Sequence, residues 1–147
     1  MRKLRFVPEG GALVEVTART LHGRYLMKPS PQLNEIVVGV LAKAKEHSPV
    51  RICALVFASS HYHLLLHVDD GEQLANFMRD VNSKIARKVG RLHRWEEKIW
   101  GRRYTDSVAS HESEAQIGRM RYLLEQGCKE GLVASPRHWP GANSSKA

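Results

Sequence analysis

Two apolar segments with only two residues between them constrain the fold of this chain more than any other feature. RICALVFA (51–58) and HYHLLLHV (61–68) have the length and apolar content of buried β-strands. Ser59 and Ser60 leave room only for a tight turn, so the two segments are predicted to form a β-hairpin. The longest apolar stretches of the chain, IVVGVLA (36–42) and ICALVFA (52–58), are far shorter than the roughly 20 residues of a membrane-spanning helix, and no membrane partner is expected.

The segments on either side of the hairpin show helical or strand periodicity. The expected elements are, in chain order, a strand at 13–20, a helix at 31–46, the hairpin, a helix at about 72–91, a short strand near 104–108 and a helix at about 112–126. This order predicts a ferredoxin-like (RRM-like) α+β fold, an antiparallel sheet with helices on one face, followed by a C-terminal helix. One domain is expected over residues 1–140, with an irregular tail at 141–147.

The chain carries a large excess of positive charge. Its 147 residues include 23 Lys and Arg against 15 Asp and Glu, a formal net charge of +8, which favours an anionic partner such as a nucleic acid. The two cysteines, Cys53 and Cys128, are interpreted as buried or idle thiols of a reducing compartment rather than as a disulfide. We therefore expect a cytoplasmic protein that is associated with the nucleoid.

The sharpest local motif is His61-Tyr62-His63 in the second strand of the hairpin. Side chains two positions apart in a strand share a face, so the two imidazoles are predicted to project together while Tyr62 points to the other side. Two neighbouring imidazoles suit a shared divalent metal. Taken alone, however, the pattern is more often two ordinary hydrogen-bonded histidines.

The last predicted helix presents a tyrosine and an amide together. Tyr122 and Gln126 are four residues apart and therefore lie one turn apart on one face. The apolar stripe of this helix is expected to consist of Ile117, Met120, Leu124 and Cys128, with Arg119, Tyr122 and Gln126 roughly opposite. A phenol and an amide oxygen in this arrangement could serve as nucleophile and metal ligand, or simply as a boundary aromatic beside a solvated Gln.

Most of the excess charge lies between Arg79 and Arg103, where nine Lys and Arg residues stand against three acids. The cations on the predicted long helix face away from its apolar side, and Trp95, Trp100 and Tyr104 follow closely. Cations interleaved with aromatic rings suit phosphate contact and base stacking, although a charge run is also typical of a solvated helix face. The expected DNA-binding residues are Arg79, Lys84, Arg87, Lys88, Arg91, Arg94, Arg102, Arg103 and Tyr104.

Three blocks, in this order, resemble the insertion-sequence-200-like single-tyrosine HUH transposases, especially their REP-associated tyrosine transposase branch. HYHLLLHV (61–68) is similar to the strand that names the HUH fold, IWGRRYTDSVAS (99–110) to the segment before the last helix, and RYLLEQGCKEGLV (121–133) to the nucleophile helix. The resemblance extends from about residue 13 to 140. The chain differs from the family at Ala58-Ser59-Ser60, where Met-Pro-Asn is usual, and at Gln126-Gly127, where the branch favours Asn-Pro.

The resemblance implies a fold, an activity and a set of site residues. His61, His63 and Gln126 would hold one divalent metal, Mg²⁺ or Mn²⁺, against the scissile phosphate. Tyr122 would attack that phosphate and leave a 5′-phosphotyrosine link and a free 3′-hydroxyl. The implied partner is single-stranded or hairpin DNA, and a homodimer is compatible with the family.

Other assignments stay open from the residues themselves. Tyr104 is the rival nucleophile because it follows two arginines, whereas Tyr25 and Tyr62 are weaker candidates. The chain could instead be a non-catalytic nucleic-acid-binding module of the same fold. A third alternative is a small metallohydrolase in which His61 and His63 bind Zn²⁺.

Overall fold

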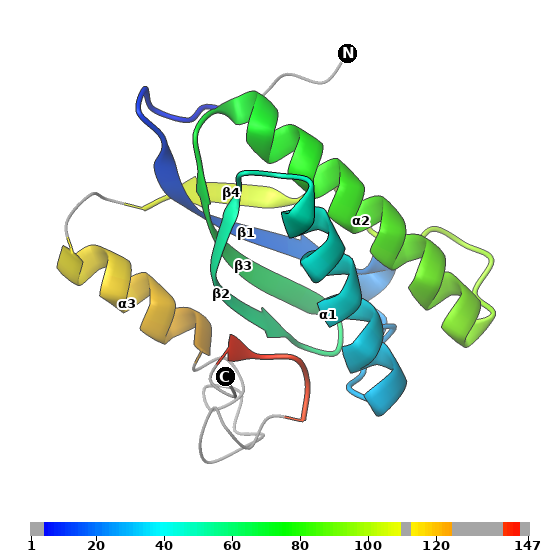
Figure 1. Cartoon of the computed structure of the whole chain (residues 1–147). Coiled ribbons are helices and arrows are strands. Elements are labelled where there is room, and N and C mark those ends of the chain that lie inside the picture. Colours follow the sequence, from blue (N-terminus) through cyan, green and yellow to red (C-terminus); the bar gives the residue numbers. More distant parts are fainter. Residues whose placement is uncertain (1–4, 110–112, 125–139, 145–147) are drawn as a thin grey trace.

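A four-stranded antiparallel sheet forms the centre of the computed structural model, which describes residues 5–109, 113–124 and 140–144 (Figure 1). The strands are β1 (Ala12–Arg19), β2 (Arg51–Phe57), β3 (His61–Val68) and β4 (Thr105–Val108). Their order in the sheet is β2-β3-β1-β4, so the two long central strands have a neighbour on both sides. The predicted hairpin is confirmed as β2 and β3, and the ferredoxin-like α+β fold is confirmed with it.

Three α-helices and one short 3-10 turn connect or follow the strands. They are η1 (Leu21–Gly23), α1 (Pro31–Glu46), α2 (Gly71–His93) and α3 (Ser113–Leu124). Side chains fix where the first two α-helices begin: the Ser30 hydroxyl accepts from the Leu33 amide at 3.0 Å, and Asp70 caps α2 in the same way. Among the described residues, no helix is long and apolar enough to cross a membrane.

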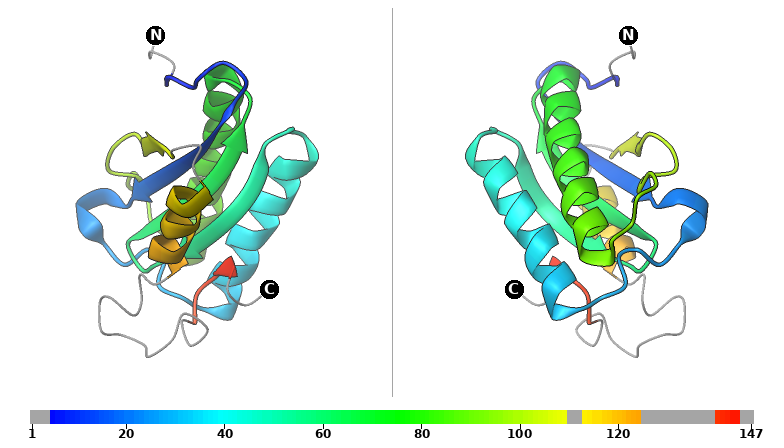
Figure 2. Two further views of the ribbon diagram at one scale, coloured as in Figure 1. Left: turned by 90° about the vertical axis from the view of Figure 1, so that its left-hand side faces the viewer. Right: turned by 90° about the vertical axis from the view of Figure 1, so that its right-hand side faces the viewer.

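The two faces of the sheet are covered very differently. Helices α1 and α2 lie together over one face, and α3 lies over the other (Figure 2). The even-numbered residues of β1 and β3 from Ala12 to Ala18 and from Tyr62 to Val68 pack under α1 and α2 in the main core. On the α3 face a small separate cluster contains Ala54, Val56, Ala58, Leu65 and Leu123.

The register of the central strands determines which polar residues meet on the α3 face. His61 lies opposite Arg19 and His63 lies opposite Thr17 on β1, while Val56 of β2 lies on the other side of His63. The hairpin turn closes with an Ala58 N–H to His61 carbonyl bond of 2.8 Å. The α3 face of the sheet therefore carries a polar row at the end of β3 where His61 lies.

The described C-terminal segment returns to the sheet at β2. The Phe57 amide donates to the Ala142 carbonyl at 2.9 Å, and Asn143 forms an isolated bridge with Val56. The Ser144 hydroxyl accepts from the Leu55 amide at 2.9 Å and donates to the Leu55 carbonyl at 3.1 Å. These bonds cover part of the outer edge of β2, which would otherwise expose unpaired backbone groups.

Candidate active site

His61 and His63 form the centre of the candidate site. Both project from β3 toward the α3 face, their ring centroids are 5.1 Å apart in an edge-to-face arrangement, and each residue is only 7% exposed. Tyr62 points to the opposite side, where its hydroxyl donates to Asn82 in the main core. The predicted alternation of side chains along this strand is therefore confirmed.

The two ring nitrogens of His63 have different surroundings. Nδ1 lies 2.9 Å from the Thr17 hydroxyl and 3.7 Å from the Glu15 carboxylate, whereas Nε2 is buried and has no hydrogen-bond partner within the described part of the chain. The nearby carboxylate favours the tautomer that keeps the proton on Nδ1. That tautomer leaves a lone pair on the unpartnered Nε2.

The charge state of His63 fits the same tautomer. Burial is the main cause that lowers the pKa of His63 from 6.5 to about 4, and electrostatic repulsion from His61 and Arg19 lowers it further. The ring is therefore neutral at physiological pH, and a neutral imidazole is the form that binds a metal.

His61 has a comparable arrangement at the start of the strand. Its Nδ1 lies 3.3 Å from the Ser60 hydroxyl, and the Ser60 carbonyl is held by the amide and hydroxyl of Thr20 at 2.9 and 3.0 Å. The turn residue that departs from the family pattern thus contacts the first histidine. A hydroxyl at this position helps to orient the ring of His61.

The donor set fits a divalent metal only in part. Two neighbouring imidazoles, with the unpartnered Nε2 of His63, suit Mn²⁺ or Zn²⁺. Among the described residues, no three His, Cys, Asp or Glu side chains are placed to hold one metal ion, so a third protein ligand would have to be an amide or another residue. Gln126, the predicted third ligand, lies outside the described residues.

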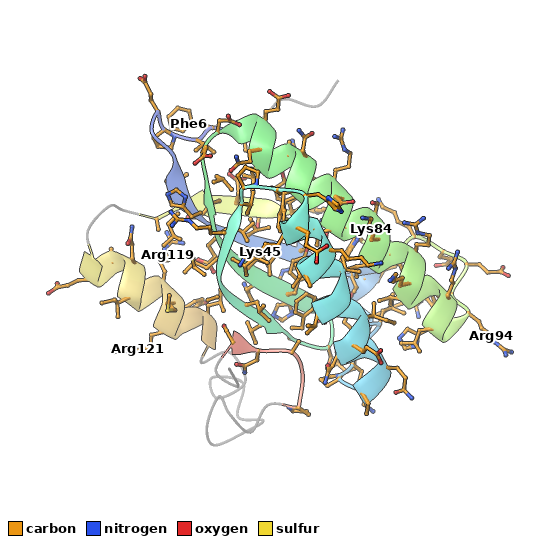
Figure 3. The ribbon with its side chains drawn as sticks, viewed as in Figure 1. Phe6, Lys45, Lys84, Arg94, Arg119 and Arg121 are labelled. Atoms are coloured by element: carbon orange, nitrogen blue, oxygen red, sulfur yellow. The ribbon has the colours of Figure 1, made fainter. Side chains whose placement is uncertain are left out.

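Helix α3 contacts this face through an ion pair of Arg119 and through the apolar side chain of Leu123. Arg119 places one nitrogen 2.7 Å from the Glu15 carboxylate and another 3.0 Å from the Ser107 hydroxyl of β4. Figure 3 shows Arg119 pointing from α3 toward the sheet, and Arg121 on the opposite side of the helix. Leu123 is fully buried among small residues of β2 and β3.

The predicted apolar stripe of this helix is wrong. Ile117 is 58% exposed and Met120 is 37% exposed, whereas Leu123 is fully buried against the sheet. Arg119, expected to point away from the protein, faces it. The reason is that the covered sheet face is polar around Glu15, so an arginine rather than an aliphatic stripe matches it. Cys128 and the Leu124 side chain lie outside what the structure describes.

Tyr122 lies beside the same carboxylate. An open cavity of about 430 Å³ is lined by Glu15, Ala115, Gly118, Arg119 and Tyr122, and Tyr122 is 48% exposed. Glu15 therefore borders both the cavity of the tyrosine and Nδ1 of His63. The fold brings the predicted nucleophile and the histidine pair to one face of the sheet.

Tyr104 and Tyr62, the alternative nucleophiles that lie in the core, are far less accessible to a substrate than Tyr122. Tyr104 is 7% exposed, with guanidinium groups of Arg5 and Arg103 about 5.5 Å from its ring centre, so little of the ring that was predicted to contact DNA is accessible. Burial raises the pKa of Tyr62 far above its ordinary value, so this phenol stays neutral.

The predicted basic helix face lies on the other side of the sheet. Helix α2 packs on the face opposite His61 and His63, and its cations point outward from it (Figure 3 labels Lys84 and Arg94). The residues concerned are Arg79, Lys84, Arg87, Lys88 and Arg91, of which Lys84 pairs with Asp80 at 2.9 Å. The cations of α2 are near the histidines and Tyr122 in sequence, but the sheet separates them in space.

Sequence reasoning missed Glu15, Thr17 and Arg19 as neighbours of the histidines. All three are odd-numbered residues of β1, the positions that the alternation places away from the core. Only the pairing of β1 with β3 brings them beside His61 and His63. Cys53, interpreted as a buried or idle thiol, is free and exposed.

Comparisons with known proteins agree with this arrangement. The family model described as Transposase IS200 like matches residues 23–126. No curated protein sequence shows a significant match. A solved REP-associated tyrosine transposase bound to a REP hairpin superposes with a TM-score of 0.76 at 17% identity, covering 96% of this chain and 81% of that chain.

A second solved structure is a protein of Deinococcus radiodurans R1 described as a candidate transposase. It superposes with a TM-score of 0.56 at 16% identity, covering 83% of this chain and 96% of that chain. At such identities these structures establish the shared fold. The family model adds the sequence relationship, since it spans most of the chain and includes both histidines and Tyr122. This chain belongs to the IS200-like transposase family.

Proposed function

We propose that this protein cuts and rejoins single-stranded or hairpin DNA, with Tyr122 as nucleophile and with His61, His63 and Gln126 holding a Mg²⁺ or Mn²⁺ ion. The observation that carries the proposal is the buried, unpartnered Nε2 of His63 beside His61, on the sheet face to which α3 brings Tyr122. Family membership supports the DNA-processing part of the proposal.

The reaction conserves the energy of the DNA backbone. The Tyr122 oxygen attacks the scissile phosphorus, the bond to the 3′ oxygen breaks, and a phosphotyrosine on the 5′ side replaces it. The phenolic proton leaves, and the departing 3′ oxygen takes up a proton to become a hydroxyl. The reverse attack by a 3′-hydroxyl rejoins strands without an external energy source. A bound divalent ion would withdraw charge from the phosphate oxygens during attack.

The surrounding residues keep the reacting groups in place. Thr17 and Glu15 hold Nδ1 of His63, so its ring presents Nε2, and Ser60 contacts Nδ1 of His61. Arg119 fastens α3 to Glu15 of its own chain. This ion pair favours an arrangement in which Tyr122 serves the histidine pair of its own chain, whether or not the protein is a homodimer.

The decisive experiment follows the covalent intermediate. The protein is incubated with Mn²⁺ and a labelled DNA hairpin that carries single-stranded flanks, and denaturing electrophoresis detects protein that retains the label. Wild type is expected to form the adduct, Tyr122→Phe to form none while still binding DNA, and Tyr104→Phe to form it as wild type does. Adduct in Tyr122→Phe would contradict the assignment of the nucleophile.

A non-catalytic nucleic-acid-binding module is the second candidate. The observation in its favour is that no three His, Cys, Asp or Glu side chains of the described residues are placed to hold one metal ion. It predicts hairpin binding that chelation of divalent ions does not change, with no cleaved strand. Cleavage that needs Mn²⁺ but leaves a free 5′ end would instead favour a metallohydrolase.

A further inference from the structure

An exposed group of cations and aromatic rings lies at the end of the sheet where His61 begins β3. Two connections form it, the one after β1 (20–30) and the one before β4 (94–104). Their backbones are bonded directly: the Leu21 amide donates to the Ile99 carbonyl at 2.7 Å, and the Gly101 amide donates to the Arg19 carbonyl at 3.0 Å. Figure 2 shows the blue segment after β1 beside the yellow-green segment before β4.

This end of the molecule adjoins the histidine pair. Arg19 is the cross-strand partner of His61, and its side chain shares the α3 face with that ring because paired residues of neighbouring strands point the same way. The Thr20 hydroxyl lies 2.6 Å from the Arg24 carbonyl and 3.0 Å from the Ser60 carbonyl. The loop that carries Arg24 is thereby tied to the turn that precedes His61.

The charge of this loop has one sign. Arg19, Arg24 and Lys28 are all exposed, and no Asp or Glu occurs between Glu15 and Glu35. The facing connection adds exposed Arg94, Lys98 and Arg102, together with the acids Glu96 and Glu97. The acid-free loop is therefore the part of this end that attracts phosphate most strongly.

Aromatic rings accompany these cations. Tyr25 is 73% exposed, an unusual position for a ring of this size, and it directly follows Arg24. The Arg24 guanidinium lies 5.1 Å from the centre of the Trp95 ring, which holds it extended across the two connections. An exposed ring beside fixed cations is the arrangement on which unpaired bases stack while phosphates meet arginine. Bases inside a duplex cannot reach such a ring.

We propose that Arg19, Arg24 and Tyr25 form a binding surface for the unpaired strand of DNA that leads to the His61–His63 pair, with one base stacked on Tyr25. The proposal rests on the proposed function for the identity of the ligand as DNA. It places the strand at the loop end of the sheet rather than on the outer face of α2.

The test measures binding alone, without divalent ions, by fluorescence anisotropy. One probe is a hairpin with a single-stranded flank, and the other is the same hairpin with a blunt end. Tyr25→Ala and Arg24→Ala are each expected to weaken binding of the flanked hairpin roughly tenfold and to leave the blunt hairpin within about twofold. Tyr25→Phe, which keeps the ring, is expected to bind both probes as wild type does.

Two further variants separate this surface from general charge effects. Lys43→Ala removes one exposed cation from α1, and it measures how much DNA affinity is lost when any single positive charge is removed. Arg87→Ala removes one from the outer face of α2. The proposal is overturned if Arg87→Ala weakens the flanked hairpin more than Arg24→Ala does, or if Tyr25→Ala weakens both probes equally.

The outcome distinguishes this surface from the proposed function. If Tyr25→Ala and Arg24→Ala leave DNA affinity unchanged while wild type still forms the Tyr122 adduct, the proposed binding surface is wrong and the proposed function stands. Wild-type protein that binds neither probe would overturn both. Since Tyr25 and Arg24 are exposed, thermal unfolding of each variant is expected to match wild type.

Discussion

At the scale of single residues, the site depends on a neutral, buried imidazole. His63 is 7% exposed, and its pKa of about 4 lies well below that of a histidine in the unfolded chain, about 6.5. Between these two pH values the His63 imidazole is protonated in the unfolded chain and neutral in the native protein. His63 therefore does not lower the free energy of unfolding above pH 6.5, and it lowers this free energy progressively as the pH falls from 6.5 toward 4.

This linkage gives a measurable pH dependence. Denaturant unfolding of wild type and of His63→Gln is compared at pH 7 and pH 4.5. The free energy of unfolding of wild type is expected to fall by about 2 kcal/mol more than that of the variant. Replacing the exposed His22 by Asn serves as control and should leave the wild-type difference unchanged. Parallel losses in wild type and His63→Gln would contradict the buried, neutral state of His63.

Strand periodicity predicts the common orientation of His61 and His63, but not their neighbours. The alternation in β1 shows that Glu15 and Thr17 leave the core, and it does not say which strand they will meet. That depends on a pairing between strands more than 40 residues apart in sequence, in which Thr17 lies opposite His63. Contacts of this kind follow from the register of the sheet, which a single sequence leaves open.

At the scale of elements, α3 is the helix whose attachment is least evident from its sequence. Its few apolar residues are compatible with more than one buried side, and the predicted stripe selects the wrong one. The long helices α1 and α2 are predicted well because each has a continuous apolar face and a capping side chain at its start. A short helix that docks on a polar sheet through an arginine lacks both signals.

The ion pair between Arg119 and Glu15 predicts how α3 responds to substitution. Arg119→Met leaves the Glu15 carboxylate, 12% exposed, without its cation and loosens the helix that carries Tyr122. We expect the rate of adduct formation to fall at least about tenfold while hairpin affinity stays within about twofold, and Arg119→Lys to restore part of the rate. Single-turnover adduct formation and anisotropy measure the two quantities.

Arg121→Met is the matched control for this helix. Arg121 is exposed on the side of α3 that faces away from the sheet (Figure 3), so its loss should leave the rate of adduct formation unchanged. Equal rates for Arg119→Met and wild type would show that the ion pair does not position Tyr122.

At the scale of the whole molecule, the sheet separates two groups of residues that lie close together in sequence. The cations of α2 lie in the chain between the strand of His61 and His63 and the helix of Tyr122. The structure places them behind the sheet, because apolar residues of β1 and β3 point toward α1 and α2. The sequence indicates that one face of each strand is buried, but not that a third helix covers the other face.

The unequal cover of the two faces predicts an order of local stability. Helices α1 and α2 share a large continuous core with the sheet, whereas α3 contributes Leu123 to a cluster of five buried residues. Amide hydrogen exchange is therefore expected to be faster in α3 than in β3, through opening of α3 alone. Leu123→Ala should accelerate exchange in α3 and leave β3 unchanged.

Leu64→Ala provides the contrasting substitution, since Leu64 is fully buried on the face of α1 and α2. It is expected to lower the free energy of unfolding by about 2–5 kcal/mol and to accelerate exchange throughout the sheet. Amide hydrogen exchange followed by mass spectrometry measures both variants, Leu123→Ala and Leu64→Ala. Amides of α3 that exchange as slowly as those of β3 in wild type would contradict independent opening. Opening of α3 alone would move Tyr122 relative to His61 and His63 while the two histidines keep their contacts with Thr17 of β1 and Ser60 of the hairpin turn.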